Sequence, residues 1–412
     1  MKKRTGNSAT LLVIFAALTV CVAAKAQVEP AATGSSAKLD YDLGYSESAG
    51  FYANYPDVYQ RGTVSGEIEY LNGKGHTPFS LMYSGGYIIG ISGSDSGTGL
   101  FQHMMISQGY VTEHGSLNLS DQVSYYPQSP TTGFSGIPGI GDLPGLPGVP
   151  SEPVLSLNTR SFNDEAILNY SRSLTYDTTF NIAGNYTWLR FPNGGGLAIN
   201  QVGVRPQVSW RLNALNSASV QYSYSRFNYL GSPFVMETQS VEPGYMRVWN
   251  RRFTTSVSAG PEWIQSNNDL VVPSTVGVAA NASAAYSLRS MSASLDYFRS
   301  VSAGAGLQSQ IGVHYNDVSA NVFRKFGRDT TISVTASYLQ TQGILQSGVT
   351  DAEMAGANAT RRLGDFVTAS AGYTAFQQTS SLTLPTGALH GISQVISFSI
   401  AYHPRETRII VH

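Results

Sequence analysis

A fifteen-residue stretch that the chain uses twice decides the fold: "RSLTYDTTFNIAGNY" at 172–186 and "RKFGRDTTISVTASY" at 324–338. Arg, Asp, Thr, Thr and Tyr stand at the same offsets in both copies. The second half of each copy alternates apolar and polar residues, as Phe180, Ile182 and Tyr186 do with the residues between them. A period of two is typical of a strand with one apolar and one polar face. Each copy therefore predicts a tight turn followed by a strand.

The same alternation continues along the chain, for example in "FSLMYSGGYIIGI" (79–91), "SLNLSDQVSYY" (116–126) and "VISFSIAY" (395–402). Many such segments reach about ten residues, close to the 9–11 that cross a bilayer at a tilt, whereas strands of globular proteins average about 5–6. Aromatic residues gather towards one end of the strands, which predicts a girdle at a lipid–water boundary rather than ordinary cross-strand pairing. These residues are Tyr186, Trp188, Tyr222, Tyr224, Tyr297, Tyr338 and Tyr373.

The N-terminus has the three parts of a secretory signal peptide. Residues 2–4 are basic, residues 11–24 are apolar, and Ala24-Lys25-Ala26 is a small-x-small cleavage signal. A membrane anchor is the alternative, but the apolar run is short for a spanning helix. We therefore predict that residues 1–26 are removed and that 27–37 form a short periplasmic segment.

Composition narrows the class of the mature chain. The single cysteine, Cys21, lies in the signal, as do four of the 25 basic residues and none of the 26 acidic ones, which leaves a net charge of −5 and favours no nucleic-acid partner. Charged residues make up 12% of the chain, against about 25% in soluble domains. No second apolar run is long enough for a membrane helix. An exported β-solenoid, a sandwich or a transmembrane β-barrel fits these properties, and the girdle favours the barrel.

Turn and loop signals set the expected number of strands. Arginine precedes the tight turns, and Asp or Asn helps the chain reverse. Short turns alternate with longer connections, which predicts an up-and-down antiparallel barrel of 16–18 strands, with 18 favoured. Segment 231–250 reads as irregular. The strands are expected to begin near 38, 61, 78, 100, 116, 160, 178, 199, 217, 239, 254, 275, 291, 307, 329, 352, 366 and 391, and the external loops are expected at 47–60, 93–99, 127–159, 192–198, 231–238, 265–273, 342–351 and 379–390.

Over residues 38–403 the chain resembles bacterial outer-membrane β-barrel proteins of the porin-like kind. The signal, the alternating strands, the repeated turn unit and the terminal "QVISFSIAYH" carry this resemblance. It implies an outer-membrane location, contact with membrane lipid and with the outer-membrane assembly machinery, and it is compatible with a homo-oligomer. One departure is that such proteins commonly end on an aromatic residue. Here residues 404–412 follow Tyr402, either as a periplasmic tail or with Ile409 and Val411 in the closing strand.

The long external loop 127–159 holds a Gly- and Pro-rich segment, "TGFSGIPGIGDLPGLPGVPSEP". We predict that residues 133–151 fold partly into the barrel mouth and restrict it, as the third loop does in porins that this design resembles. A loop outside the mouth is an equal alternative. The candidate constriction residues are Gly136, Ile137, Pro138, Gly139, Asp142, Pro144, Gly145, Pro147 and Gly148.

Catalysis finds little support in the sequence. We assign no catalytic, cofactor-binding or metal-binding residue and expect no cofactor, because the seven histidines form no close ligand pair. The segment "GVHYND" (312–317) offers a histidine and an acid but no specific nucleophile, so an outer-membrane hydrolase is a weak alternative. A Ser-, Thr-, Asn- and Gln-rich lumen predicts a water-filled passage for small neutral solutes or an exported saccharide polymer. The alternative is a plugged barrel with a structural or adhesive role.

Overall fold

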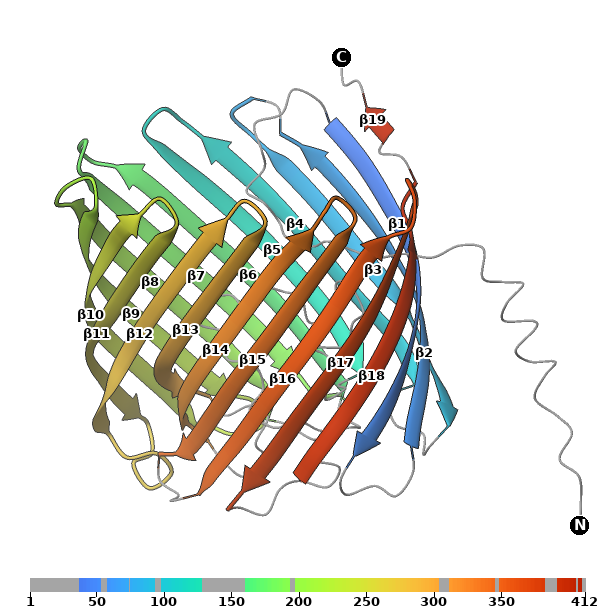
Figure 1. Cartoon of the computed structure of the whole chain (residues 1–412). Helices are drawn as coiled ribbons and strands as arrows, with labels where there is room; N and C mark the ends of the chain where they lie inside the picture. Colours follow the sequence, from blue (N-terminus) through green and yellow to red (C-terminus); the bar gives the residue numbers. More distant parts are fainter. Residues whose placement is uncertain are drawn as a thin grey trace, which may run out of the picture.

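A computed structural model describes residues 37–52, 58–73, 75–92, 98–127, 160–192, 197–303, 311–344, 348–381, 391–404 and 407–409. These residues form a closed barrel of eighteen long antiparallel strands and one short strand, β19 (Figure 1). The all-β barrel and the favoured strand number are thus confirmed. None of these residues belongs to a helix long and apolar enough to cross a membrane.

The long strands have 12 to 16 residues each, as the length of the alternating segments predicted. Their bounds are β1 (Ala37–Tyr52), β2 (Val58–Asn72), β3 (Phe79–Ser92), β4 (Gly99–Val111), β5 (Gly115–Pro127), β6 (Arg160–Ser173), β7 (Thr178–Arg190), β8 (Ile199–Arg211), β9 (Asn216–Tyr229), β10 (Val235–Asn250), β11 (Phe253–Ser266), β12 (Thr275–Leu288), β13 (Met291–Ser302), β14 (Val313–Phe326), β15 (Thr330–Gly343), β16 (Val349–Arg362), β17 (Val367–Ser380) and β18 (Gly391–Tyr402).

Each strand pairs with the next one along the chain, and β18 pairs with β1 to close the barrel. The closing register runs from Leu43 opposite Tyr402 to Tyr52 opposite Ser393. The short strand β19 (Thr407–Ile409) continues this seam by pairing with the first residues of β1 (Figure 1). Ile409 thus pairs with Ala37 of β1, whereas Val411 lies outside the described residues.

Strand β18 shows how the predicted alternation sorts side chains between the two faces of the wall. Phe398 is 62% exposed on the outside, whereas its neighbours Ser397 and Ser399 are buried on the inside. The same phase holds in β15, where Val334 is exposed and Ser333 faces the interior side. A barrel that is apolar outside and polar inside satisfies its backbone hydrogen bonds without a free sheet edge, as a bilayer requires.

Two outward tyrosines point their hydroxyls towards the long-loop end of the barrel. The hydroxyl of Tyr338 donates to Asp351 at 2.7 Å, and that of Tyr373 donates to Gln394 at 3.1 Å. Each acceptor lies two residues nearer the long-loop end than the residue directly opposite the tyrosine. The rings therefore point their polar ends away from the apolar band, as a girdle at a lipid–water boundary does.

The two copies of the repeated stretch have the same structural role. Each contains a short turn between two long strands, at 174–177 and 327–329. The carbonyl of Asp177 accepts a hydrogen bond from Arg211 N at 2.7 Å, and the carbonyl of Asp329 accepts one from Arg362 N, also at 2.7 Å. Each turn is thus tied to the start of the next turn around the rim, which explains why one barrel reuses the device.

Several expected boundaries were wrong. Strand β1 extends to Tyr52 and β2 begins at Val58, so most of the loop expected at 47–60 is strand. The segment expected to be irregular contains β10, a sixteen-residue strand from Val235. The strand expected near 307 begins at Val313, and a long connection between β13 and β14, at 303–312, was missing from the expected loops.

Candidate functional site

The long-loop end of the β13–β14 hairpin leaves the barrel wall. Pairing between β12 and β13 stops at Ala280 opposite Arg299. Strand β13 nevertheless continues to Ser302, paired with β14 alone. The last residues of β13 and the first residues of β14 are therefore free to bend away from β12.

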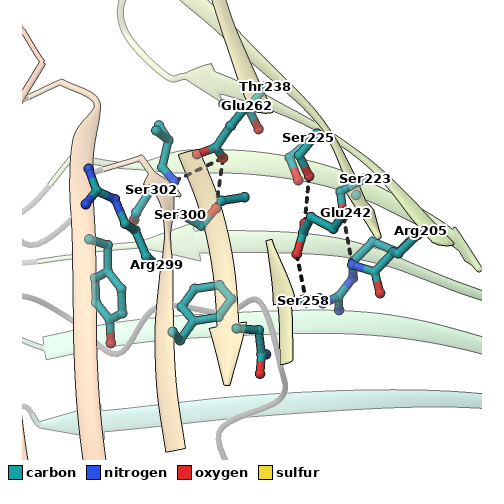
Figure 2. Close-up of a pocket in the computed structure, with 18 of the residues that line it drawn as sticks. Arg205, Ser223, Ser225, Thr238, Glu242, Ser258, Glu262, Arg299, Ser300 and Ser302 are labelled. Carbon is teal, nitrogen blue, oxygen red and sulfur yellow. Dashed lines mark hydrogen bonds between the residues drawn. The ribbon is translucent and has the colours of Figure 1, made fainter. Parts of the chain in front are cut away.

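Hydrogen bonds show that the bend is inward. Glu262 of β11 faces the interior, and its Oε1 accepts hydrogen bonds from Ser300 Oγ at 2.9 Å and from Val301 N at 3.1 Å (Figure 2). The hydroxyl of Tyr229, on β9, donates to the carbonyl of Ala303 at 2.7 Å. The hairpin end thus crosses the inner face of β12 and contacts β11 and β9 beyond it.

An apolar cluster inside the barrel holds the bent hairpin. It joins inward side chains of β8 to β11 with residues of the hairpin and the loop after β11. Its buried members are Ile199, Phe227, Tyr229, Phe234, Met236, Ile264, Val272, Val301 and Ala303.

Gly312 lies next to this cluster, directly before β14. Its backbone has a φ of 72°, a conformation that glycine adopts without strain. A Cβ atom there would also lie 2.9 Å from Met236 Sδ.

A polar cavity of about 160 Å³ lies against the hairpin on the inner wall. Hydroxyl and amide side chains line most of it, together with Arg205, Glu242, Glu262 and Arg299 (Figure 2). Glu242 accepts hydrogen bonds from Ser240 Oγ at 2.8 Å and from Ser258 Oγ at 3.3 Å.

Residues of opposite charge lie near one another over a wider belt of this wall. Arg205 interacts electrostatically with Glu242 on one side and with Glu165 on the other. Glu165 is also held by Gln122 Nε2, which donates to it at 2.8 Å. Arg299 interacts in the same way with Glu262. Because an unpaired buried charge is costly, these contacts offset part of the cost of burying the two arginines and three glutamates.

A second polar cluster joins the closing strands. Nδ1 of His403 lies 2.8 Å from Asp42 Oδ1, and its Nε2 contacts the hydroxyl of Thr368. The three residues come from β1, from β17 and from the end of β18. The order of hydroxyl, imidazole and carboxylate resembles a hydrolytic triad, but its position across the seam gives it a clear role in joining the first strand to the last two.

The predicted constriction residues, Gly136 to Gly148, lie outside the described residues, as does the rest of 128–159. The inward hairpin was missed. A signal for it was present in β9, where the aromatic residues change face: Tyr222 and Tyr224 point outward, whereas Phe227 and Tyr229 are buried inside. Within the described part of the chain, no three His, Cys, Asp or Glu side chains come together as metal ligands.

The closed barrel, its apolar outer wall and its polar interior define the chain as an outer-membrane β-barrel protein of the porin-like kind. No family model and no curated protein matches the sequence. The fold is similar to solved structures of OccK5 from Pseudomonas aeruginosa (10% identity, 90% of this chain and 99% of that one, TM-score 0.46) and OccAB3 from Acinetobacter baumannii (9% identity, 90% and 99%, TM-score 0.47).

It is also similar to the ferric citrate transporter FecA, at 14% identity and a TM-score of 0.44. That match covers 83% of this chain but 60% of FecA, so this chain spans less than two thirds of that protein. These likenesses concern the barrel as a whole and assign the chain to no particular family.

Proposed function

We propose that the barrel forms an aqueous passage for small neutral polar solutes, narrowed by the inward end of the β13–β14 hairpin. The observation that carries this proposal is the hairpin's attachment to the inner wall through Glu262 and Tyr229. An element fixed across the interior of a barrel reduces the open cross-section at that level. Barrels of 16–18 strands are wide enough to hold water beside such an element.

The inner wall supports neutral rather than charged solutes. Its two arginines are interleaved with three glutamates, so that most of the charge cancels: Arg205 interacts with Glu165 and Glu242, and Arg299 interacts with Glu262. A wall with little net charge does not concentrate ions of one sign. Its hydroxyl and amide groups offer hydrogen bonds to solutes such as sugars. An exported polysaccharide chain would contact the same groups.

A plugged, structural barrel is the second candidate, and the apolar cluster favours it. A cluster that buries Met236, Ile264 and Val272 inside the barrel would be typical of a region that excludes water. We propose no catalytic role, since the seam cluster of His403 is explained by its place between the closing strands. We also propose that residues 133–151 restrict the passage at its mouth.

Single-channel conductance in a planar bilayer tests the proposal. Glu262→Ala removes the acceptor of the hydrogen bonds from Ser300 and Val301. This change should release the hairpin end and raise the conductance. Glu237→Ala is the matched control, because Glu237 faces outward and forms a partly exposed ion pair with Arg226 at 3.3 Å. An unchanged conductance in Glu262→Ala would show that the hairpin is not the narrow point. A protein that conducts in neither form would favour the plugged barrel.

The long loop is tested separately. Replacing residues 136–148 with a short Gly-Ser linker should raise the conductance further if this loop also restricts the mouth. If the loop lies outside and binds a surface partner, the conductance stays the same and surface binding is lost.

A further inference from the structure

Basic side chains are concentrated on one arc of the short-turn end. Six consecutive turns, from the β6–β7 turn to the β16–β17 turn, each have at least one arginine in the turn or within three residues of it. All of these basic side chains are exposed, and the arc holds three exposed acids, Asp177, Asp329 and Asp365. The basic residues are Arg172, Arg211, Arg247, Arg251, Arg252, Arg289, Arg324, Lys325, Arg328, Arg361 and Arg362.

Little within the chain neutralises these charges. Among the described residues, Arg362 is the member of the arc that forms an ion pair, with Asp365 at 3.7 Å. The β4–β5 turn, which lies outside the arc, carries Glu113 and His114 and no arginine. Arginine is therefore a feature of these six turns and is not shared by every turn of this rim.

Four of these arginines repeat one local pattern. Arg172, Arg247, Arg324 and Arg361 stand near the ends of β6, β10, β14 and β16, in the phase of each strand that faces outward. Two residues further on, each is followed by an exposed apolar side chain. These apolar residues are Leu174, Trp249, Phe326 and Leu363.

In two of the four pairs the guanidinium lies over the aromatic ring. Arg247 Cζ is 4.0 Å from the ring centroid of Trp249, and Arg324 Cζ is 4.6 Å from that of Phe326. Stacking occupies the flat face of the guanidinium and leaves its N–H edges free. Those edges match the geometry of phosphate oxygens, to which arginine donates two parallel hydrogen bonds.

We propose that this arc binds the headgroups of anionic phospholipids in the leaflet that surrounds the short-turn end. The arginines supply positive charge and phosphate-matched donors, and each exposed apolar side chain supplies a contact for the lipid's glycerol and acyl region. A free phosphate ion would use the arginines but would leave Leu174, Trp249, Phe326 and Leu363 in water. An amphiphilic partner accounts for both halves of the pattern.

The test measures lipid binding to the folded full-length barrel in neutral detergent, with a fluorescent phosphatidylglycerol as probe and a fluorescent phosphatidylcholine as the neutral comparison. In the test variant, Arg172, Arg247, Arg324 and Arg361 are all changed to Gln. Arg226→Gln is the control, because Arg226 faces outward near the opposite end of the barrel. Heat-modifiable migration on a detergent gel confirms that each variant is folded.

We expect phosphatidylglycerol to bind the unmodified protein more tightly than phosphatidylcholine does, and the preference to weaken as salt rises. Each arginine should contribute about fivefold to the affinity at low ionic strength, and Arg226→Gln should change nothing. If the variant with four substitutions does not fold, the double variant Arg247→Gln with Arg324→Gln replaces it. Its affinity for phosphatidylglycerol should be lower by about 25-fold. Equal binding of the two lipids, unchanged binding in the variant, or full competition by inorganic phosphate would each overturn the proposal.

Discussion

Val334 of β15 offers the most direct test of which face of the wall meets lipid. It lies four residues from Tyr338, whose hydroxyl marks the girdle at the long-loop end. With a rise of about 3.4 Å per residue and a tilt of about 40°, the two residues are separated by roughly 10 Å along the membrane normal. Half of an apolar band about 25 Å tall is only slightly more, so Val334 lies close to the bilayer midplane. Val334→Arg should therefore destabilise the barrel by about 2–4 kcal/mol.

The neighbouring residue is the control. Ser333 has the same backbone neighbours but lies on the interior face, opposite Phe323 and Asn358. Ser333→Arg should cost less than about 1 kcal/mol, because an arginine on the interior face does not enter the lipid. The measurement is the free energy of unfolding from urea titrations of the barrel in lipid vesicles. Equal costs at the two positions would refute the assignment of faces, and small costs at both would refute the membrane environment.

Three further predictions concern the hairpin, the seam and the N-terminus. Gly312→Ala should displace the hairpin, because the new Cβ would lie 2.9 Å from Met236 Sδ on a backbone with positive φ; higher proteolytic susceptibility of the hairpin checks this, and unchanged resistance would contradict it. His403→Ala should lower the free energy of unfolding by about 1–2 kcal/mol through loss of its contact with Asp42, and a value equal to the unmodified protein's would show that the seam does not depend on it. N-terminal sequencing of the mature protein should begin at Gln27, and a retained Met1 would disprove cleavage.

The sequence was sufficient to predict the barrel because its signals are local. Alternation, tight turns and strand length each operate within about fifteen residues, and a closed barrel requires them to repeat. The phase at Phe398 and Val334 followed directly from counting residues in twos. Errors at strand ends, as at Tyr52 and Val235, arose because pairing with a neighbouring strand extended these strands beyond their alternating core.

The candidate site could not be predicted in the same way because it depends on contacts between distant segments. Glu262 and Ser300 meet only because the ladder between β12 and β13 ends early. No local sequence pattern indicates where the hydrogen-bonded pairing between two strands ends. The prediction of a restriction was placed on the Gly- and Pro-rich loop because its composition was conspicuous, whereas the hairpin has ordinary strand composition up to its bend.

The inner face of β12 nevertheless contains a physical reason for the bend. The hairpin can cross this strand only if side chains there leave room, and the inward positions near its start are Gly277 and Ala279. A Cβ atom on Gly277 would lie 3.4 Å from the imidazole of His314 on the hairpin, so a methyl group would just fill the space between them. Ala279 is almost fully buried. Larger side chains at these two positions would push the hairpin away from β12 and separate Ser300 from Glu262. The small residues of β12 therefore help to set where the hairpin crosses the inner wall, and with it the level of the restriction that we propose, although they contribute no polar group there.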